Sequence, residues 1–216
     1  MSEKLFKDRI TKTDYESMIK DLGEAIDKGD DALKQLLLGT TEPELYTAHG
    51  NYQLGDHQSC SELDGDSFTE KRLCKCLYFY NSPYRRPEEC KVCDFEERYT
   101  LTGRYQIKDY EVPAHYYVKG VGKIDLMLAD GAALYATEVK PYKGNEEKLL
   151  RMVAEIITYT LGTVQYKRAI AFFENTPQDE EYKTISPALQ ALLKKADITV
   201  FRFEKRQGDT YEICKL

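Results

Sequence analysis

Residues 122–140, GKIDLMLADGAALYATEVK, decide the fold of the chain. Two apolar segments flank a turn at Asp130-Gly131, and this pattern predicts an antiparallel hairpin. After the hairpin, apolar spacing predicts a helix, a strand, a second helix and two strands, at residues 145–161, 168–174, 187–196, 198–204 and 211–215. Strands that alternate with helices in this way predict an α/β fold with a mixed sheet flanked by helices.

The chain before the hairpin begins with helices. Thr13-Asp14-Tyr15-Glu16 has the pattern of a capping box, and apolar residues follow at helical spacing up to Gly29. A second helix is expected at residues 30–38, and strands rich in Tyr, Leu and Val at residues 73–80 and 98–112. The expected organisation is an N-terminal helical part, a cysteine-rich insertion and a core, at residues 1–56, 57–112 and 113–216.

The composition is that of a folded chain without a membrane segment. The 216 residues are enough for one substantial core, and 12% aromatic residues argue against disorder. No apolar run approaches the roughly 18 residues that span a bilayer, and MSEKLFKDRI lacks the apolar core of a signal peptide. We therefore expect a soluble, cytoplasmic protein. The net charge is −6, but residues 71–216 carry 24 Lys and Arg against 21 Asp and Glu, so a polyanion should contact that later part.

Charged residues converge at one end of the predicted hairpin. Asp125 lies in its first strand, and Glu138 and Lys140 end its second strand. Residues two apart in a strand share a face, so Glu138 and Lys140 should point the same way. Neither belongs at the end of an apolar strand without a partner, because an unpaired buried charge is costly. We expect two carboxylates and one ammonium to meet there.

This set of groups is what metal-dependent phosphodiester hydrolysis requires. Mg²⁺ takes oxygen ligands and keeps several waters, so Asp125, Glu138 and the carbonyl of Val139 would be enough to bind it. The metal would acidify a water and stabilise charge on a phosphate. Lys140 would hold or help to deprotonate the attacking water, or neutralise the developing negative charge.

The succession of Gly122-Lys123-Ile124-Asp125, a hairpin, Glu138-Val139-Lys140 and a helix resembles the PD-(D/E)xK nuclease superfamily, and in particular its RecB-type exonuclease branch. The resemblance covers roughly residues 115–205 and implies a restriction-endonuclease-like core of the order α-β-β-β-α-β. It also implies a nuclease that uses Mg²⁺ or Mn²⁺, with DNA as the expected substrate. That branch tends to carry Gln-x-x-x-Tyr on the following helix. This chain has Glu155-x-x-x-Tyr159 there, and both side chains should support the site or contact substrate.

The family often adds a further acidic residue from its first helix, and this chain offers no clear equivalent. Glu16 belongs to the expected capping box, and Glu24 falls opposite the apolar stripe of its helix. RecB-type members often use an upstream histidine instead, for which His49, His57 and His115 are candidates. The missing acid favours an alternative function, a catalytically inactive PD-(D/E)xK-fold module that binds nucleic acid or protein.

Two cysteine pairs indicate a structural metal site. Cys74-x-Cys76 and Cys90-x-x-Cys93 place four sulfurs at a spacing that favours zinc, with Cys60 or His57 as a substitute ligand. The zinc ion would hold the insertion together. An iron–sulfur cluster, which some RecB-type nucleases carry, and free buried thiols are the alternatives. A zinc-stabilised structural adaptor is a third reading of the function.

The insertion also combines basic and aromatic residues. Residues 71–91 hold six Lys and Arg against two Glu. Cations bind phosphates and aromatic rings stack on bases, so Lys75, Tyr84, Arg85 and Arg86 are candidate contacts to nucleic acid. The alternative is a solvated hairpin with packed aromatic residues.

Overall fold

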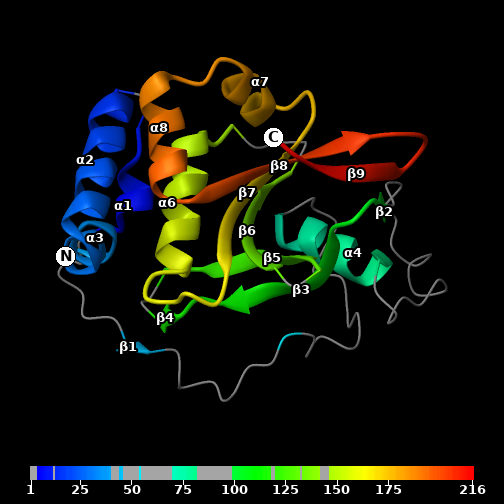
Figure 1. The fold of residues 1–216 in the computed structure, drawn as a ribbon, viewed down its shortest axis with the longest axis horizontal. Helices are drawn as coiled ribbons and strands as arrows, with labels where there is room; N and C mark the ends of the chain where they lie inside the picture. The colour runs from blue at the N-terminus through cyan, green and yellow to red at the C-terminus, as the bar shows by residue number, and fades with distance from the viewer. Residues whose placement is uncertain are drawn as a thin grey trace.

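One mixed sheet organises the structure. The computed structural model describes residues 4–11, 13–39, 44–45, 54, 70–81, 99–117, 120–131, 133–141 and 146–216. The sheet has seven strands in the order β2-β9-β8-β7-β6-β5-β3 (Figure 1). These strands are β2 (Thr100–Thr102), β3 (Gln106–Pro113), β5 (Lys123–Asp130), β6 (Ala133–Lys140), β7 (Lys167–Phe173), β8 (Ile198–Lys205) and β9 (Thr210–Lys215). β6, β7 and β8 are parallel, whereas β3, β5 and β6 are antiparallel, so the expected mixed α/β sheet is confirmed.

Helices cover both faces of this sheet (Figure 1). One face carries α1 (Phe6–Arg9), α2 (Tyr15–Lys28), α3 (Asp30–Leu38), α6 (Leu149–Tyr159) and α8 (Pro187–Lys195). Their apolar sides share one core with sheet residues such as Met127 and Ile170. The opposite face carries α4 (Glu70–Asn81), whose Leu73 and Leu77 share a second core with Leu126 and Phe203. No helix in these parts of the chain combines the length and the apolar character needed to cross a bilayer.

Most of the elements expected after residue 98 are present. The hairpin is β5–β6, with pairs running from Asp130↔Ala133 to Leu126↔Thr137. The strand expected at residues 98–112 is divided into β2 and β3, and a separate pair joins β1 (Glu44–Leu45) to β4 (Tyr116–Tyr117). The sequence pattern does not predict α7 (Pro177–Lys183), because its residues are mostly polar. A capping hydroxyl at Thr176 and a proline at the first helical position start this helix.

The strand expected at residues 73–80 is wrong, because these residues belong to α4. The buried pairs Leu73-Cys74 and Leu77-Tyr78 recur one helical turn apart, which is the helical period. The abundance of Tyr, Leu and Cys favours a strand by propensity, but burial of one helical face against the sheet prevails. Cys74 is fully buried. Residues two apart in a helix do not face each other, so Cys74 and Cys76 point in different directions from α4.

The cysteine-rich insertion is not seen in the part of the chain that the structure describes. Cys60, Cys90 and Cys93 lie outside the described residues, as do His49, His57 and the candidate nucleic-acid contacts Tyr84, Arg85 and Arg86. The zinc site and the division of the chain at residues 56 and 112 therefore stay predictions.

The capping box expected at Thr13 is wrong as well. α2 begins at Tyr15 with Asp14 as its N-cap, and no side chain caps it. The Thr11 hydroxyl donates to Oδ2 of Asp14 at 2.9 Å and lies 3.2 Å from the Thr13 hydroxyl. These local side-chain contacts replace the reciprocal bonds of a capping box.

Side chains from two other helices hold the N-terminus of α6. The backbone N–H of Leu149 donates to Oε2 of Glu181, and that of Leu150 donates to the Tyr15 hydroxyl oxygen, each at 3.2 Å. The Tyr15 hydroxyl in turn donates to Glu181. The first N–H groups of a helix have no partners within the helix, so these bonds fix α6 to α2 and α7. α6 is the helix that carries Glu155 and Tyr159.

The packing of α4 makes a prediction about its two cysteines. Cys74→Ser should lower the free energy of unfolding by about 1–3 kcal/mol, because it places a hydroxyl in the apolar core beneath α4. Cys76→Ser, at a half-buried position of the same helix, is the control and should cost less than about 0.5 kcal/mol. Urea unfolding measures both values. If both variants instead lost the same free energy of unfolding, and a zinc chelator increased both losses, a zinc ion held by both sulfurs would be favoured.

Candidate metal centre

Three carboxylates from three different elements meet at one end of the hairpin. Glu70 comes from the first turn of α4, Asp125 from β5 and Glu138 from β6. One oxygen of each lies within 4.8 Å of the others, which is close enough for all three to contact one ion. Asp125 and Glu138 are buried, whereas the Glu70 side chain is 32% exposed. The group is therefore buried on two sides and reaches solvent at Glu70.

The pairing of β5 with β6 ends next to Asp125 and Glu138. The last β5–β6 pair is Leu126↔Thr137, one residue before Asp125 and Glu138 would face each other. Oδ2 of Asp125 accepts the backbone N–H of Val139 at 2.8 Å, so a side chain replaces a main-chain partner. This bond satisfies a buried donor and holds the Asp125 carboxylate beside the end of β6.

The ammonium of Lys140 lies among four carboxylates. Its Nζ is 2.7 Å from Oε1 of Glu138 and 2.8 Å from Oε2 of Glu70. It is also 2.9 Å from Oε2 of Glu147 and 3.3 Å from Oε2 of Glu155. The contact between Glu138 and Lys140 confirms that these two side chains point the same way. The Lys140 side chain is only 3% exposed, so its charge is stabilised mainly by these carboxylates and little by water.

This arrangement has more acceptors than donors. An ammonium offers three N–H groups, which is fewer than the four carboxylates around it. Oε2 of Glu138 is buried and has no hydrogen-bond partner among the residues that the structure describes. A divalent cation takes hard oxygen ligands, and three clustered carboxylates with an unsatisfied oxygen among them fit that requirement. The donor set therefore fits a divalent ion such as Mg²⁺ or Mn²⁺ without selecting between them.

The surplus of negative charge changes the proton affinities at the site. Burial, and then the Glu70 carboxylate, raise the pKa of Asp125 well above its usual range. Burial, and then Asp125, raise the pKa of Glu138 in the same way. Burial alone would lower the pKa of Lys140, but the carboxylates of Glu138, Glu155 and Glu70 outweigh it and raise that pKa. Lys140 therefore stays an ammonium at neutral pH.

The helix α6 brings two more of the expected residues to the site. Glu155 is buried and lies 3.3 Å from the Lys140 ammonium. Burial tends to raise the pKa of Glu155, but Lys140 and other neighbours outweigh this effect and lower it. Tyr159 is one turn further along α6, and burial followed by the Glu138 and Glu155 carboxylates raises its pKa. The five residues expected at the site from the sequence thus lie together.

Three contributors to this site were not expected from the sequence. Glu70 adds a carboxylate from the start of α4, and Glu147 adds one just before α6; both contact Lys140. Lys7 of α1 lies 3.6 Å from Oε1 of Glu155. Among the earlier candidates, Glu24 is exposed and pairs with Lys20 and Lys28 on α2, so it is not at the site. The signal for Glu70 was its position at the start of a helix, which the expected strand obscured.

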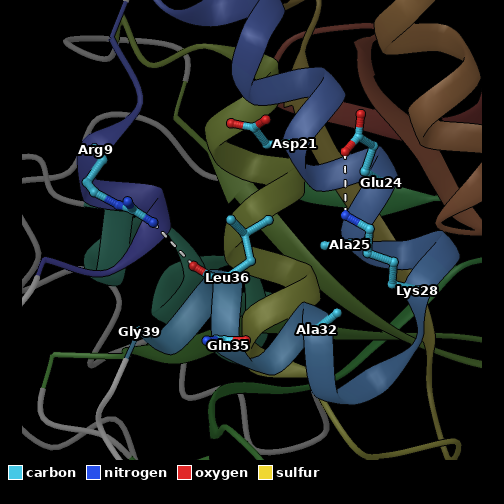
Figure 2. Close-up of a pocket in the computed structure, with 9 residues that line it drawn as sticks. All are labelled: Arg9, Asp21, Glu24, Ala25, Lys28, Ala32, Gln35, Leu36 and Gly39. Atoms are coloured by element: carbon cyan, nitrogen blue, oxygen red, sulfur yellow. Dashed lines mark hydrogen bonds and ion pairs between the residues drawn. The ribbon is translucent and has the colours of Figure 1, made fainter.

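A pocket of about 500 Å³ lies elsewhere, among α1, α2 and α3 (Figure 2). Three of its charged residues already have partners. Glu24 pairs with Lys28 at 3.6 Å, and Arg9 donates to the carbonyl of Leu36 at 3.3 Å. None of the carboxylates around Lys140 lines this pocket.

Comparison with known proteins adds little to this geometry. No family model matches the chain, and no curated protein matches it. Among solved structures, the chain is similar to SfsA of Pyrococcus furiosus, which was solved in complex with Ca²⁺. The match has 16% sequence identity and a TM-score of 0.28, and it covers 67% of this chain and 60% of that chain. Similarity at this level shows neither a common fold nor a common function.

The raised carboxylate pKa values predict how the metal-free chain responds to pH. Groups whose pKa is higher in the folded than in the unfolded state bind protons on folding, so stability falls as pH rises above their unfolded pKa near 4. Asp125→Asn removes one such group while keeping an oxygen for the Val139 N–H. At pH 8 and without metal we expect this variant to be more stable than the native chain, by on the order of 1 kcal/mol or more. Mg²⁺ should stabilise the native chain and have less effect on the variant.

Thermal unfolding from pH 5 to pH 8, with EDTA or with Mg²⁺, measures this linkage. Asp21→Asn, at an exposed position on α2, is the control and should follow the native curve. A metal-free native chain that is as stable at pH 8 as Asp125→Asn would contradict the prediction.

Gly122 makes a second prediction, because it lies against Tyr159. Its φ is +98°, and a Cβ there would be 2.7 Å from the Tyr159 hydroxyl oxygen. Gly120 in the same turn has φ of +85° with nothing within 4 Å of a Cβ. Gly120→Ala should therefore show only the backbone strain of about 1–3 kcal/mol, and Gly122→Ala should lose more. Urea unfolding compares the two variants, and equal losses would show that the contact with Tyr159 is unimportant.

Proposed function

We propose that this chain is a divalent-metal-dependent nuclease of the PD-(D/E)xK type that hydrolyses phosphodiester bonds, with DNA as its substrate. The observation that carries the proposal is the carboxylate group Glu70, Asp125 and Glu138 beside the buried ammonium of Lys140. The chain runs α4, β2, β3, β4, β5, β6, α6 and β7, where β2 is an edge strand and β4 lies outside the main sheet. With these two strands set aside, the order is α-β-β-β-α-β, the core that the resemblance implies, and this supports the proposal.

Each residue of the group has a role in this reaction. Glu70, Asp125 and Glu138, with the carbonyl of Val139, would hold the ion. A bound divalent cation supplies positive charge that stabilises the phosphate and makes an attacking water more acidic. Lys140 keeps its proton, so it orients the water and neutralises charge on the phosphate rather than acting as a base. The partly exposed side chains of Glu70 and Glu147 mark the side from which a substrate can approach.

Glu70 also weighs against the alternative of a catalytically inactive module. That alternative rested on the missing acid from the first helix. Glu70 lies on α4, which is the first helix of the proposed core order, and contacts Lys140 directly. Contacts to DNA through Lys75, Tyr84, Arg85 and Arg86 remain part of the proposal, as does a structural zinc ion.

Cleavage of labelled DNA and RNA tests the function. We expect the native chain to cut single- or double-stranded DNA with Mg²⁺ or Mn²⁺, and not with EDTA. Lys140→Ala and Glu70→Gln should each lower kcat by roughly 100-fold or more, because each removes charge that acts on the transition state. The controls are Lys108→Ala on β3 and Glu24→Gln on α2, both exposed, and they should cut at the native rate.

The outcomes separate the candidate functions. Cleavage that survives in Lys140→Ala would point to a contaminant or a different site. Native protein that binds DNA without cutting it would favour the inactive binding module. Cleavage of RNA alone would retain the nuclease and change its substrate.

A further inference from the structure

Lys7 is a second buried lysine at this site, and it comes from the first described helix of the chain. It is 7% exposed, although α1 has only four residues. Its ammonium donates to the carbonyl of Val121 at 2.9 Å and to the Tyr159 hydroxyl oxygen at 3.0 Å. It also pairs with Oε1 of Glu155 at 3.6 Å. Burying a long charged side chain is costly, so these contacts must offset that cost.

The contact with Lys7 decides how the Tyr159 hydroxyl is used. An ammonium has only donors, so the phenol oxygen must act as the acceptor in this pair. The phenol hydrogen is then available to donate, and among the described residues it has no acceptor. The raised pKa of Tyr159 shows that this hydrogen is retained. A buried donor without a partner is expected to bond to a ligand when one is present.

The position of Tyr159 places this donor beside the candidate metal centre. The Lys7 ammonium contacts both the Tyr159 hydroxyl oxygen, at 3.0 Å, and Oε1 of Glu155, at 3.6 Å. Oε2 of Glu155 in turn lies 3.3 Å from the Lys140 ammonium, so the Tyr159 hydroxyl lies close to the acidic group. Its oxygen packs on Gly122, three residues before Asp125.

Lys7 and Asp8 hold α1 in place on α6. Besides the Lys7 contacts, Oδ1 of Asp8 lies 3.6 Å from the Arg151 guanidinium. Arg151 also pairs with Glu147 and Glu155, which both contact Lys140. The segment that carries Lys7 is therefore tied to the same network as the metal centre.

We propose that Lys7 is a positioning residue that sets the Tyr159 hydroxyl as a hydrogen-bond donor to an oxyanion, a phosphate oxygen of the substrate, bound at the acidic group. This inference rests on the proposed function and adds a second cation to it. Lys7 acts through Tyr159 and does not contact the substrate itself. Its charge polarises the phenol and makes it a stronger donor to an anion.

A double-mutant cycle tests whether Lys7 acts through Tyr159. Lys7→Met and Tyr159→Phe should each lower kcat by about 10- to 100-fold, with Mg²⁺ affinity changed by less than about 3-fold. The double variant should be no worse than the worse single variant by more than about 2-fold, because both changes remove one hydrogen bond. Lys7→Arg keeps the charge and the donors and should recover most of the rate. Lys20→Met, whose lysine side chain is 76% exposed on α2, is the control for a lost charge.

A binding measurement tests the same coupling without catalysis. Calorimetry of the Mg²⁺-loaded chain with inorganic phosphate should show about a 5-fold or greater loss of affinity in Lys7→Met and in Tyr159→Phe, and no further loss in the double variant. If Lys7→Met does not fold, Tyr159→Phe and Lys7→Arg decide the question. Native phosphate affinity in Tyr159→Phe would then overturn the proposal.

The inference and the proposed function fail in different ways. A native chain that binds phosphate with this coupling but cuts no nucleic acid would contradict the nuclease and support the role of Lys7. Cleavage at the native rate by Lys7→Met, with only its melting temperature lowered, would overturn the role of Lys7 and retain the nuclease. Losses in kcat that multiply in the double variant would also overturn it.

Discussion

The ammonium of Lys140 is the group on which the arrangement of this site depends. Four carboxylates lie within 3.3 Å of it, and they come from both faces of the sheet. Glu70 belongs to α4 on one face, and Glu155 belongs to α6 on the other. Carboxylates this close repel one another strongly in a medium of low polarity, so a shared cation is required to hold them together. One ion pair network thereby fixes the position of two helices at the end of β6.

The single ammonium of Lys140 only partly balances the negative charge of the carboxylates around it. The excess negative charge is reflected in the direction of the pKa shifts at the site. The carboxylates of Asp125 and Glu138 hold protons more tightly than usual, since burial and their acidic neighbours disfavour the second charge. Glu155 is buried to a similar extent but faces Lys140, Lys7 and Arg151, and its pKa is lowered. The acidic side and the basic side of the network are therefore distinct. The side that attracts protons is the side that would attract a metal ion, because both satisfy the same unpaired oxygens.

The parts of this site that could be predicted from sequence are those joined by local geometry. Glu138 and Lys140 are two residues apart in a strand, and Asp125 is placed by a short hairpin. Glu155 and Tyr159 are one helical turn apart on α6, so the packing of this one helix brings both side chains to the site. Glu70 and Lys140 are 70 residues apart, and Lys7 and Tyr159 are 152 residues apart. No periodicity connects such residues, because their meeting depends on how helices pack on the two faces of the sheet.

The strand wrongly expected at residues 73–80 shows why Glu70 was not expected beside Lys140. Read as a strand, the segment places Cys74 and Cys76 together and leaves Glu70 in a loop. As a helix, the same segment places Leu73, Cys74 and Leu77 against the sheet, with the partly exposed Glu70 in the first turn. Cys74 is one turn after Glu70, so the burial that fixes the cysteine also directs the glutamate to the end of β6. The apolar contacts of α4 therefore place one of the three carboxylates that could hold a metal ion, so the acidic group depends on apolar packing as well as on the charge of Lys140.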